Sequence, residues 1–238
     1  LEPLTVNLPN DYTLMLRGRI DRVDQAIENE QLYLRIVDYK SSSKGLNLTE
    51  VYYGLALQML AYLDVVLQNA ENWLGQKASP AGVLYFHVHN PMISASDFLT
   101  EDKIEQEIFK KFKMKGLLVD QEDVVRMMDT SLESGRSNII PAGFSKSGSF
   151  YKGSDVAERE IFDQLQGYIH QLMENAGLAI TEGKVDLNPY QQQQLTACTF
   201  CEFRSVCQFD PTLAENNYRR LKEMKDEEVI EAIKRGEG

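Results

Sequence analysis

Two extended stretches of sequence, separated by a short turn, most constrain the fold of this chain. Residues 13–24 (TLMLRGRIDRVD) and 32–40 (LYLRIVDYK) are rich in aliphatic and β-branched residues with partial alternation, which is typical of β-strands. The residues between them, Glu28-Asn29-Glu30, are typical of a turn. We therefore predict a β-hairpin. One face of its second strand carries alternate residues, namely Leu32, Leu34, Ile36, Asp38 and Lys40.

The remaining sequence alternates between helical and extended periodicity. Thr49 is a candidate cap for a helix over about residues 50–69, and an apolar strand is predicted over 81–89. The later segments are predicted as helices over 101–115, 121–128 and 155–181, with a Ser- and Gly-rich loop over 130–154 and one or two helices at the end of the chain. This order predicts an α/β core with a mixed sheet flanked by helices.

The hairpin carries a group of residues suited to binding a metal ion. Asp38 and Lys40 are two positions apart in an extended run, so both side chains leave the same face, and a hairpin can bring Asp21 beside Asp38. Two carboxylates, and the backbone carbonyl of Tyr39, would offer oxygen ligands that suit Mg²⁺ or Mn²⁺. A metal that lowers the pKa of a water, beside the Lys40 ammonium, predicts phosphodiester hydrolysis. The alternative is an ordinary ion pair at a strand end, because Asp-x-Lys alone is a weak motif.

The run Gly18-Arg19-Ile20-Asp21-Arg22-Val23-Asp24, followed by Val37-Asp38-Tyr39-Lys40, resembles the RecB-type branch of the PD-(D/E)XK nucleases. The resemblance implies a restriction-endonuclease-like fold, metal ligation by Asp21 and Asp38, and a catalytic role for Lys40. It also implies a Gln-x-x-x-Tyr motif on the next helix, which Gln58 and Tyr62 match at a spacing that places both on one helix face. The alternative for these two is a polar and an aromatic residue at core spacing. The family also carries a helix before the first strand, for which about a dozen residues here leave no room.

Three cysteines, Cys198, Cys201 and Cys207, lie within ten residues of one another. An odd and tightly clustered set is unlike a secreted disulfide framework and favours a reducing compartment with a metal or cluster role. Thiolates suit Zn²⁺ or iron–sulfur clusters, which normally need four ligands. The alternative is a set of reduced thiols packed in an apolar turn with neighbouring phenylalanines.

The segment from Asn188 to Asp210 resembles the C-terminus of AddB-type helicase–nuclease subunits. The resemblance implies a structural [4Fe-4S] cluster held by Cys198, Cys201, Cys207 and a fourth cysteine upstream of Leu1. It implies a partner subunit of AddA type, a DNA strand from an unwound duplex end as substrate, and a cytoplasmic exonuclease that processes double-strand breaks for recombinational repair. We expect a nuclease core with helical insertions over 1–190 and a cysteine segment with C-terminal helices over 191–238.

The charge balance limits the alternatives. A net charge of −11 argues against a general nucleic-acid coat but not against a nuclease, because a carboxylate site adds negative charge that a metal offsets. Arg19, Arg22 and Lys44 are weaker candidates for phosphate contacts. We expect no membrane span, and a start at Leu1 favours a fragment of a longer protein over a processed mature chain. The competing function is a non-catalytic nuclease fold used for DNA binding or subunit docking, and a resolvase or restriction-type relative ranks lower because those usually lack the cysteine segment.

Overall fold

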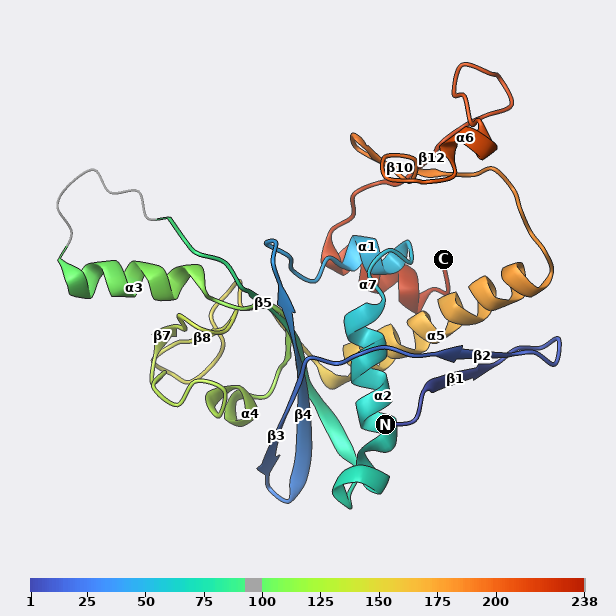
Figure 1. Ribbon diagram of the computed structural model, residues 1–238. Coiled ribbons are helices and arrows are strands. Elements are labelled where there is room, and N and C mark those ends of the chain that lie inside the picture. Colours follow the sequence, from blue (N-terminus) through green and yellow to red (C-terminus); the bar gives the residue numbers. More distant parts are fainter. Residues whose placement is uncertain (93–99, 238) are drawn as a thin grey trace.

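A five-stranded mixed sheet forms the centre of the fold in the computed structural model, which describes residues 1–92 and 100–237 (Figure 1). The strand order is β3-β4-β5-β6-β9, with β4 and β5 parallel, β6 and β9 parallel, and the other neighbours antiparallel. The strands are β3 (Arg22–Glu28), β4 (Gln31–Lys40), β5 (Ala78–His87), β6 (Lys115–Val119) and β9 (Val156–Ala157). The predicted hairpin and the predicted α/β class with a mixed sheet are confirmed.

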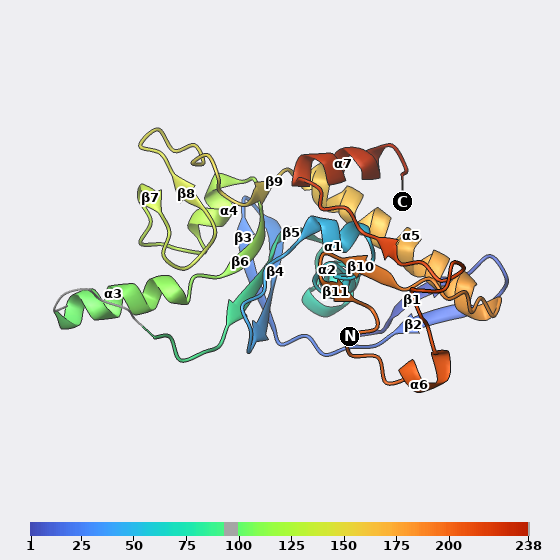
Figure 2. The ribbon, with the colours of Figure 1, turned by 90° about the horizontal axis from the view of Figure 1, so that it is seen from above.

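Helices cover both faces of this sheet (Figures 1 and 2). One side carries α1 (Leu48–Tyr52), α2 (Gln58–Leu74), α5 (Arg159–Thr181) and α7 (Asp226–Lys234). The other side carries α4 (Glu122–Arg126), the short strands β7 (Gly135–Arg136) and β8 (Gly143–Phe144), and the projecting helix α3 (Glu101–Lys111).

Strand β4 is buried on both faces, which explains its long apolar run. Leu34 and Ile36 pack with Met59 and Leu63 of α2 in one core cluster. Val37 points the other way and packs in a second cluster, which includes Leu84, Leu118, Ile140 and Phe144. The side-chain alternation of the strand therefore directs Asp38 and Lys40 to the α2 side of the sheet.

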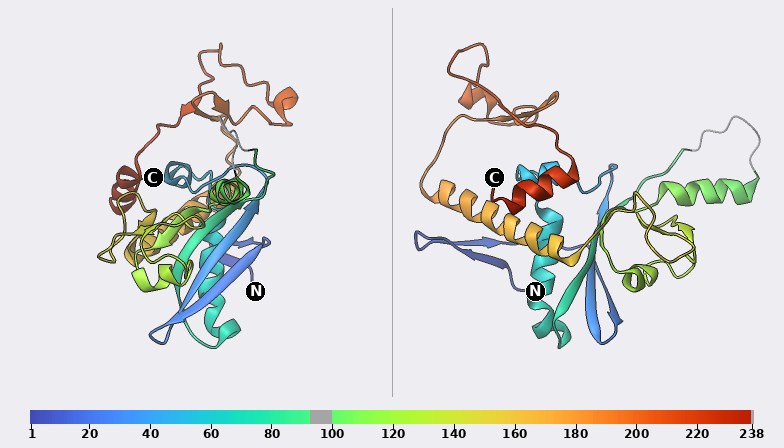
Figure 3. Two further views of the ribbon diagram at one scale, coloured as in Figure 1. Left: turned by 90° about the vertical axis from the view of Figure 1, so that its left-hand side faces the viewer. Right: turned by 180° about the vertical axis from the view of Figure 1, so that it is seen from behind.

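Smaller elements surround the core. The hairpin of β1 (Leu4–Asn7) and β2 (Thr13–Leu16) packs along α5. Beyond α5, the chain extends away from the body as a small sheet and one short helix (Figure 3). These elements are β10 (Tyr190–Gln192), β11 (Leu195–Thr196), β12 (Arg219–Arg220) and α6 (Arg204–Cys207). The chain then returns so that α7 packs on α1 and α5. The division at residue 190 stays a prediction.

The single helix predicted over residues 50–69 is wrong, because the chain breaks between α1 and α2. Gly54 adopts φ of 77°, a left-handed conformation that favours glycine and ends the first helix. The predicted cap is also wrong. Asn47, not Thr49, caps α1 by accepting a hydrogen bond from the Glu50 amide, whereas Thr49 is buried and bonds the backbone of Met224.

Three other boundaries differ from the prediction. The stretch 13–24 is two strands, β2 and β3, joined by an irregular segment over 17–21. The helix predicted over 101–115 ends at Lys111, and residues 115–119 form the strand β6, whose lysine and glycine mask its strand character. The helix predicted from residue 155 begins at Arg159, after the edge strand β9. The strand predicted over 81–89 runs from Ala78 to His87.

None of the helices in the described residues combines the length and the apolar character needed to cross a bilayer.

The close pairing of β5 and β6 predicts a sharp difference between two glycine substitutions. At Gly116, with φ of 151°, a Cβ would overlap the Val83 carbonyl oxygen of the neighbouring strand, so Gly116→Ala should lower the free energy of unfolding by about 2–4 kcal/mol. Gly167, within α5, has open space around its Cα, so Gly167→Ala should raise that free energy by about 0.5–1 kcal/mol. Urea unfolding measures both, and equal effects would contradict the assigned β5–β6 pairing.

Candidate active site

Asp38 is a buried carboxylate near the end of β4. Its exposure is 3 %, and within residues 1–92 and 100–237 its Oδ2 atom has no hydrogen-bond partner. Lys40 Nζ lies 2.7 Å from this oxygen as an ion-pair partner, although at an angle that does not make a hydrogen bond. A buried carboxylate is costly unless its charge is compensated, so this oxygen is suited to a further cationic ligand.

Tyr85 on β5 is the register partner of Asp38. Burial, and then the Asp38 charge, raises the pKa of Tyr85 to about 12. The phenol therefore stays protonated and neutral, and it adds no second negative charge beside Asp38.

Asp21 precedes β3 and lies at the same end of the hairpin. The register pairs Arg22 with Val37, so the residue before Arg22 faces the end of β4. The Asp21 Oδ2 atom accepts a hydrogen bond of 3.0 Å from the Tyr39 amide, which belongs to the peptide joining Asp38 to Tyr39. The structure thus brings the exposed Asp21 carboxylate against the backbone next to the buried Asp38.

A chain of hydrogen bonds links Lys40 to helix α2. Lys40 Nζ donates to Gln58 Oε1 at 3.2 Å, and Gln58 Nε2 donates to the Tyr62 hydroxyl at 3.0 Å. The polarity of the chain is fixed, because an ammonium group can only donate and so must face the amide oxygen. Gln58 and Tyr62 lie one helical turn apart on one face, as the sequence predicts. The structure therefore places Asp21, Asp38, Lys40, Gln58 and Tyr62 at one end of the sheet.

The segment before β3 packs closely on this chain of bonds. A Cβ on Gly18 would lie 2.8 Å from the Tyr62 Cε1 atom and 2.9 Å from the Tyr62 hydroxyl. Only a residue without a side chain lets the backbone approach the Tyr62 ring so closely. Gly18, Gln58 and Tyr62 also line a largely apolar hollow of about 800 Å³ beside the site.

The residues predicted to contact phosphate lie in different surroundings. Arg19 is exposed in the irregular segment before β3. Arg22 forms an ion pair of 2.7 Å with Asp24, and the Tyr39 side chain, then Asp24, raise the pKa of Arg22. Lys44 is exposed and lines a separate groove near the end of β5. These three cations do not converge on Asp38.

The donor set fits a hard divalent cation. Asp38 provides a buried oxygen without a hydrogen bond, and Asp21 provides a second carboxylate beside it. No group of three or more His, Cys, Asp or Glu side chains that could hold a metal ion occurs among the residues described. Two carboxylates are nevertheless what Mg²⁺ commonly takes from a protein, with waters and substrate phosphate oxygens completing its coordination.

The cysteines lie far from this site, on the segment that extends from the body (Figure 3). Cys201 is exposed, Cys198 and Cys207 are partly exposed, and all three are free thiols. They do not form a metal-ligand group in the part of the chain that the structure describes, so these thiols alone do not fit an iron–sulfur cluster here. Their predicted role stays a prediction.

A mixed sheet with two carboxylates and a lysine at a strand end defines the class of this chain. Residues 1–208 match the PD-(D/E)XK nuclease superfamily, and the chain belongs to that superfamily.

Its relatives include an AddB-type protein of Oceanobacillus iheyensis, the second of the subunits named ATP-dependent helicase/deoxyribonuclease, which is 60 % identical over 98 % of this chain. The proteins of the same name from Bacillus licheniformis and Bacillus cereus are 57 % and 55 % identical over 99 % and 98 % of the chain. The chain spans about a fifth of the length of these relatives, 20 % of each. The resemblance to AddB-type subunits is confirmed.

Sequence reasoning missed two features around the site. Gly18 is part of the nuclease motif, but its contact with Tyr62 depends on the irregular path of residues 17–21. The lysines between Lys110 and Lys115 fall within the predicted helix, whereas the structure places them along the wall of a groove. The run KKFKMK is the signal that could have indicated this groove.

The contact between Gly18 and Tyr62 predicts energetic coupling between the two residues. Gly18→Ala should lower the free energy of unfolding by about 1–2 kcal/mol because the methyl group displaces the Tyr62 ring. In a Tyr62→Ala background the same change should cost little, giving a coupling energy of at least ~1 kcal/mol. A double-mutant cycle in urea measures this, and additive effects would show that the two residues are not in contact.

Proposed function

We propose that this chain is the nuclease domain of a helicase–nuclease subunit, and that it hydrolyses phosphodiester bonds of DNA in a Mg²⁺-dependent reaction. The observation that carries the proposal is the buried Asp38 oxygen without a hydrogen bond, beside the Lys40 ammonium and the Asp21 carboxylate. Membership of the nuclease superfamily makes hydrolysis the natural use of this arrangement.

Asp21 and Asp38 would hold Mg²⁺, or Mn²⁺ in its place, with the backbone carbonyl of Tyr39 as a further ligand. When bound, the ion supplies a water of lowered pKa and offsets negative charge on the phosphate. Asp38 is held in place by its rigid, doubly buried strand, whereas Asp21 is fixed by its bond to the Tyr39 amide. The two carboxylates therefore need little rearrangement before binding the ion.

Lys40 would orient the attacking water and stabilise the charge that develops on the phosphate. Gln58 is a positioning residue, because its amide oxygen holds the Lys40 ammonium at 3.2 Å. The Tyr62 hydroxyl accepts its bond from Gln58, so its own proton remains free to donate to a phosphate oxygen of the strand.

The substrate and the assembly follow from the relatives, whose name joins a helicase to a deoxyribonuclease. We place the domain as an exonuclease that cuts a single strand released from an unwound duplex end, in complex with an AddA-type subunit, during recombinational repair in the cytoplasm. Residues 1–190 would be the nuclease core. Residues 191–238 would carry Cys198, Cys201 and Cys207 as three ligands of a [4Fe-4S] cluster, completed by a cysteine from outside this stretch.

The test is cleavage of a labelled single-stranded oligonucleotide with and without Mg²⁺. Asp38→Asn should abolish cleavage, since the neutral amide binds a hard cation poorly. Lys40→Met should slow it by about 10²- to 10⁴-fold, the usual contribution of a positioned acid–base group. Removal of the metal with EDTA should stop the parent chain.

The matched control is Asp11→Asn, the same chemical change at an exposed turn residue in the β1–β2 hairpin, which should cleave like the parent. A second readout is independent of activity. Mn²⁺ at about 100 times its dissociation constant should stabilise the parent chain by about 2.7 kcal/mol and leave Asp38→Asn unchanged. Undiminished cleavage by Asp38→Asn would reject the hydrolytic role and favour a nuclease fold kept for DNA binding or subunit docking.

A further inference from the structure

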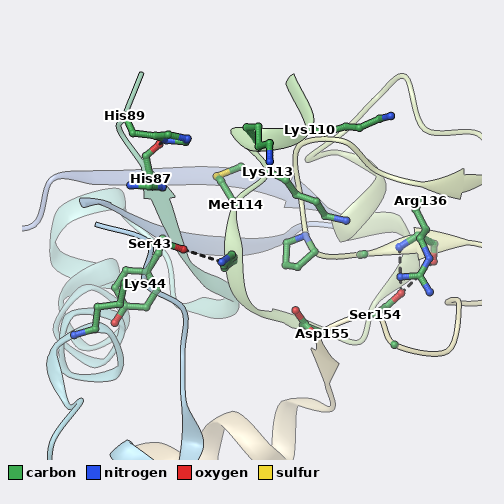
Figure 4. Close-up of a pocket in the computed structure, with 17 residues that line it drawn as sticks. Ser43, Lys44, His87, His89, Lys110, Lys113, Met114, Arg136, Ser154 and Asp155 are labelled. Carbon is green, nitrogen blue, oxygen red and sulfur yellow. Dashed lines mark hydrogen bonds between the residues drawn. The ribbon is translucent and has the colours of Figure 1, made fainter. Parts of the chain in front are cut away.

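A basic groove of about 550 Å³ opens where β5 ends, between the strands and helix α3 (Figure 4). Among the described residues that line it are six cationic side chains and a single carboxylate, Asp155. The cations are Lys44, Lys110, Lys111, Lys113, Lys115 and Arg136. In a chain with a net charge of −11, such a concentration of positive charge is a local exception.

Few of these cations are neutralised by the protein. Lys110 pairs with Glu107 at 2.6 Å, but Lys111 and Lys113 have no salt bridge within residues 1–92 and 100–237. Lys115 donates to the uncharged Ser43 hydroxyl at 2.9 Å. Burial, and then the nearby Arg136 guanidinium, lowers the pKa of Lys113, as expected for cations held together without an anion between them. An anion in the groove would relieve this repulsion.

Aromatic rings lie at the edge of the groove. The rings of His87 and His89 stack with centroids 3.9 Å apart, and Phe112 lies 5.3 Å from His89. Figure 4 shows both histidines beside the strand end, on the same side of the groove as Ser43. Cations next to aromatic faces are the combination that binds single-stranded nucleic acid, because the cations follow the backbone and the rings stack on unpaired bases.

The basic groove is continuous with the candidate active site. His87 is the register partner of Lys40, and its Nε2 atom lies 3.1 Å from the Ser41 carbonyl oxygen. Ser43 and Lys44, which line the groove, follow Lys40 by three and four residues. A strand lying in the groove can therefore reach Lys40 without crossing the body of the domain.

We infer that the basic groove binds the sugar–phosphate backbone of single-stranded DNA on its way to or from the active site. The inference rests on the proposed function and extends it by naming the path of the strand. It assigns Lys111, Lys113 and Arg136 to phosphate contacts, and it adds Lys44 as the contact nearest to Lys40.

The experiment measures binding of a labelled oligothymidylate of about 20 nucleotides to the full 238-residue chain by fluorescence anisotropy. EDTA is present so that cleavage does not interfere. Two groove variants are used, Lys111→Ala/Lys113→Ala and Lys44→Ala/Arg136→Ala. Each should weaken binding about tenfold at low salt and reduce the slope of log K against log salt by about 1.4, since each phosphate contact on a single strand contributes about 0.7.

The control is Lys77→Ala/Lys184→Ala, which removes the same charge at exposed positions before β5 and after α5, away from the groove. It should keep nearly the parent affinity and slope. Thermal unfolding of every variant shows whether the fold is retained. Unchanged affinity in both groove variants would overturn the inference, as would an equal loss in the control. Binding of a polyglutamate peptide as tightly as the oligonucleotide would identify an acidic protein segment as the ligand instead and would also overturn it.

The result is separable from the nuclease proposal. Asp38 lies outside the groove, so Asp38→Asn should bind the oligonucleotide like the parent while failing to cut it. If Asp38→Asn still cuts but the groove variants lose binding, hydrolysis by Asp38 is rejected and the groove stands. If the groove variants bind and cut like the parent while Asp38→Asn is inactive, the groove is rejected and the nuclease proposal stands.

Discussion

The burial of the Asp38 carboxylate is the constraint on which the rest of the site depends. A charge removed from water at 3 % exposure costs several kcal/mol unless partners compensate it, and here the Lys40 ammonium at 2.7 Å supplies one partner without making a hydrogen bond. Strand β4 can impose this burial because apolar clusters cover both of its faces. The core thus holds Asp38 in a position that a more exposed strand would not maintain, and it leaves one oxygen available to a cation.

The break between α1 and α2 turns this buried pair into a site. Because Gly54 ends α1, a new helix starts at Gln58, with the Gln58 amide facing the end of β4 and Tyr62 one turn further along. A continuous helix from residue 48 would carry these side chains in another direction. Gly18 then lets the chain before β3 close over Tyr62, so the hydrogen bonds from Lys40 to Tyr62 are shielded on one side.

The sequence is most informative where function restricts residue type at short spacing. Asp38 and Lys40 on one strand face, Gln58 and Tyr62 on one helix face, and the hairpin turn at Glu28–Glu30 all follow from local periodicity. The helix break at Gly54 and the strand β6 depend on tertiary contacts: Thr49 is used to hold Met224, and Gly116 is required by the β5 backbone. Periodicity within a window cannot report such contacts, so it places the lysines of 110–115 on a helix face rather than along a groove.

Net charge is a poor guide to where this chain can meet an anionic strand. Electrostatic interactions between exposed groups are screened beyond roughly 10 Å at moderate salt, so an approaching phosphate responds to nearby charges and hardly to the total of −11. The acidic residues on α7 contribute to that total, yet α7 lies on the α5 side of the sheet, whereas the cations from Lys110 to Lys115 gather beside α3 (Figure 1). Separation of the two signs across the sheet would leave one accessible positive face next to Lys40, and it would direct a polyanion to that face instead of repelling it.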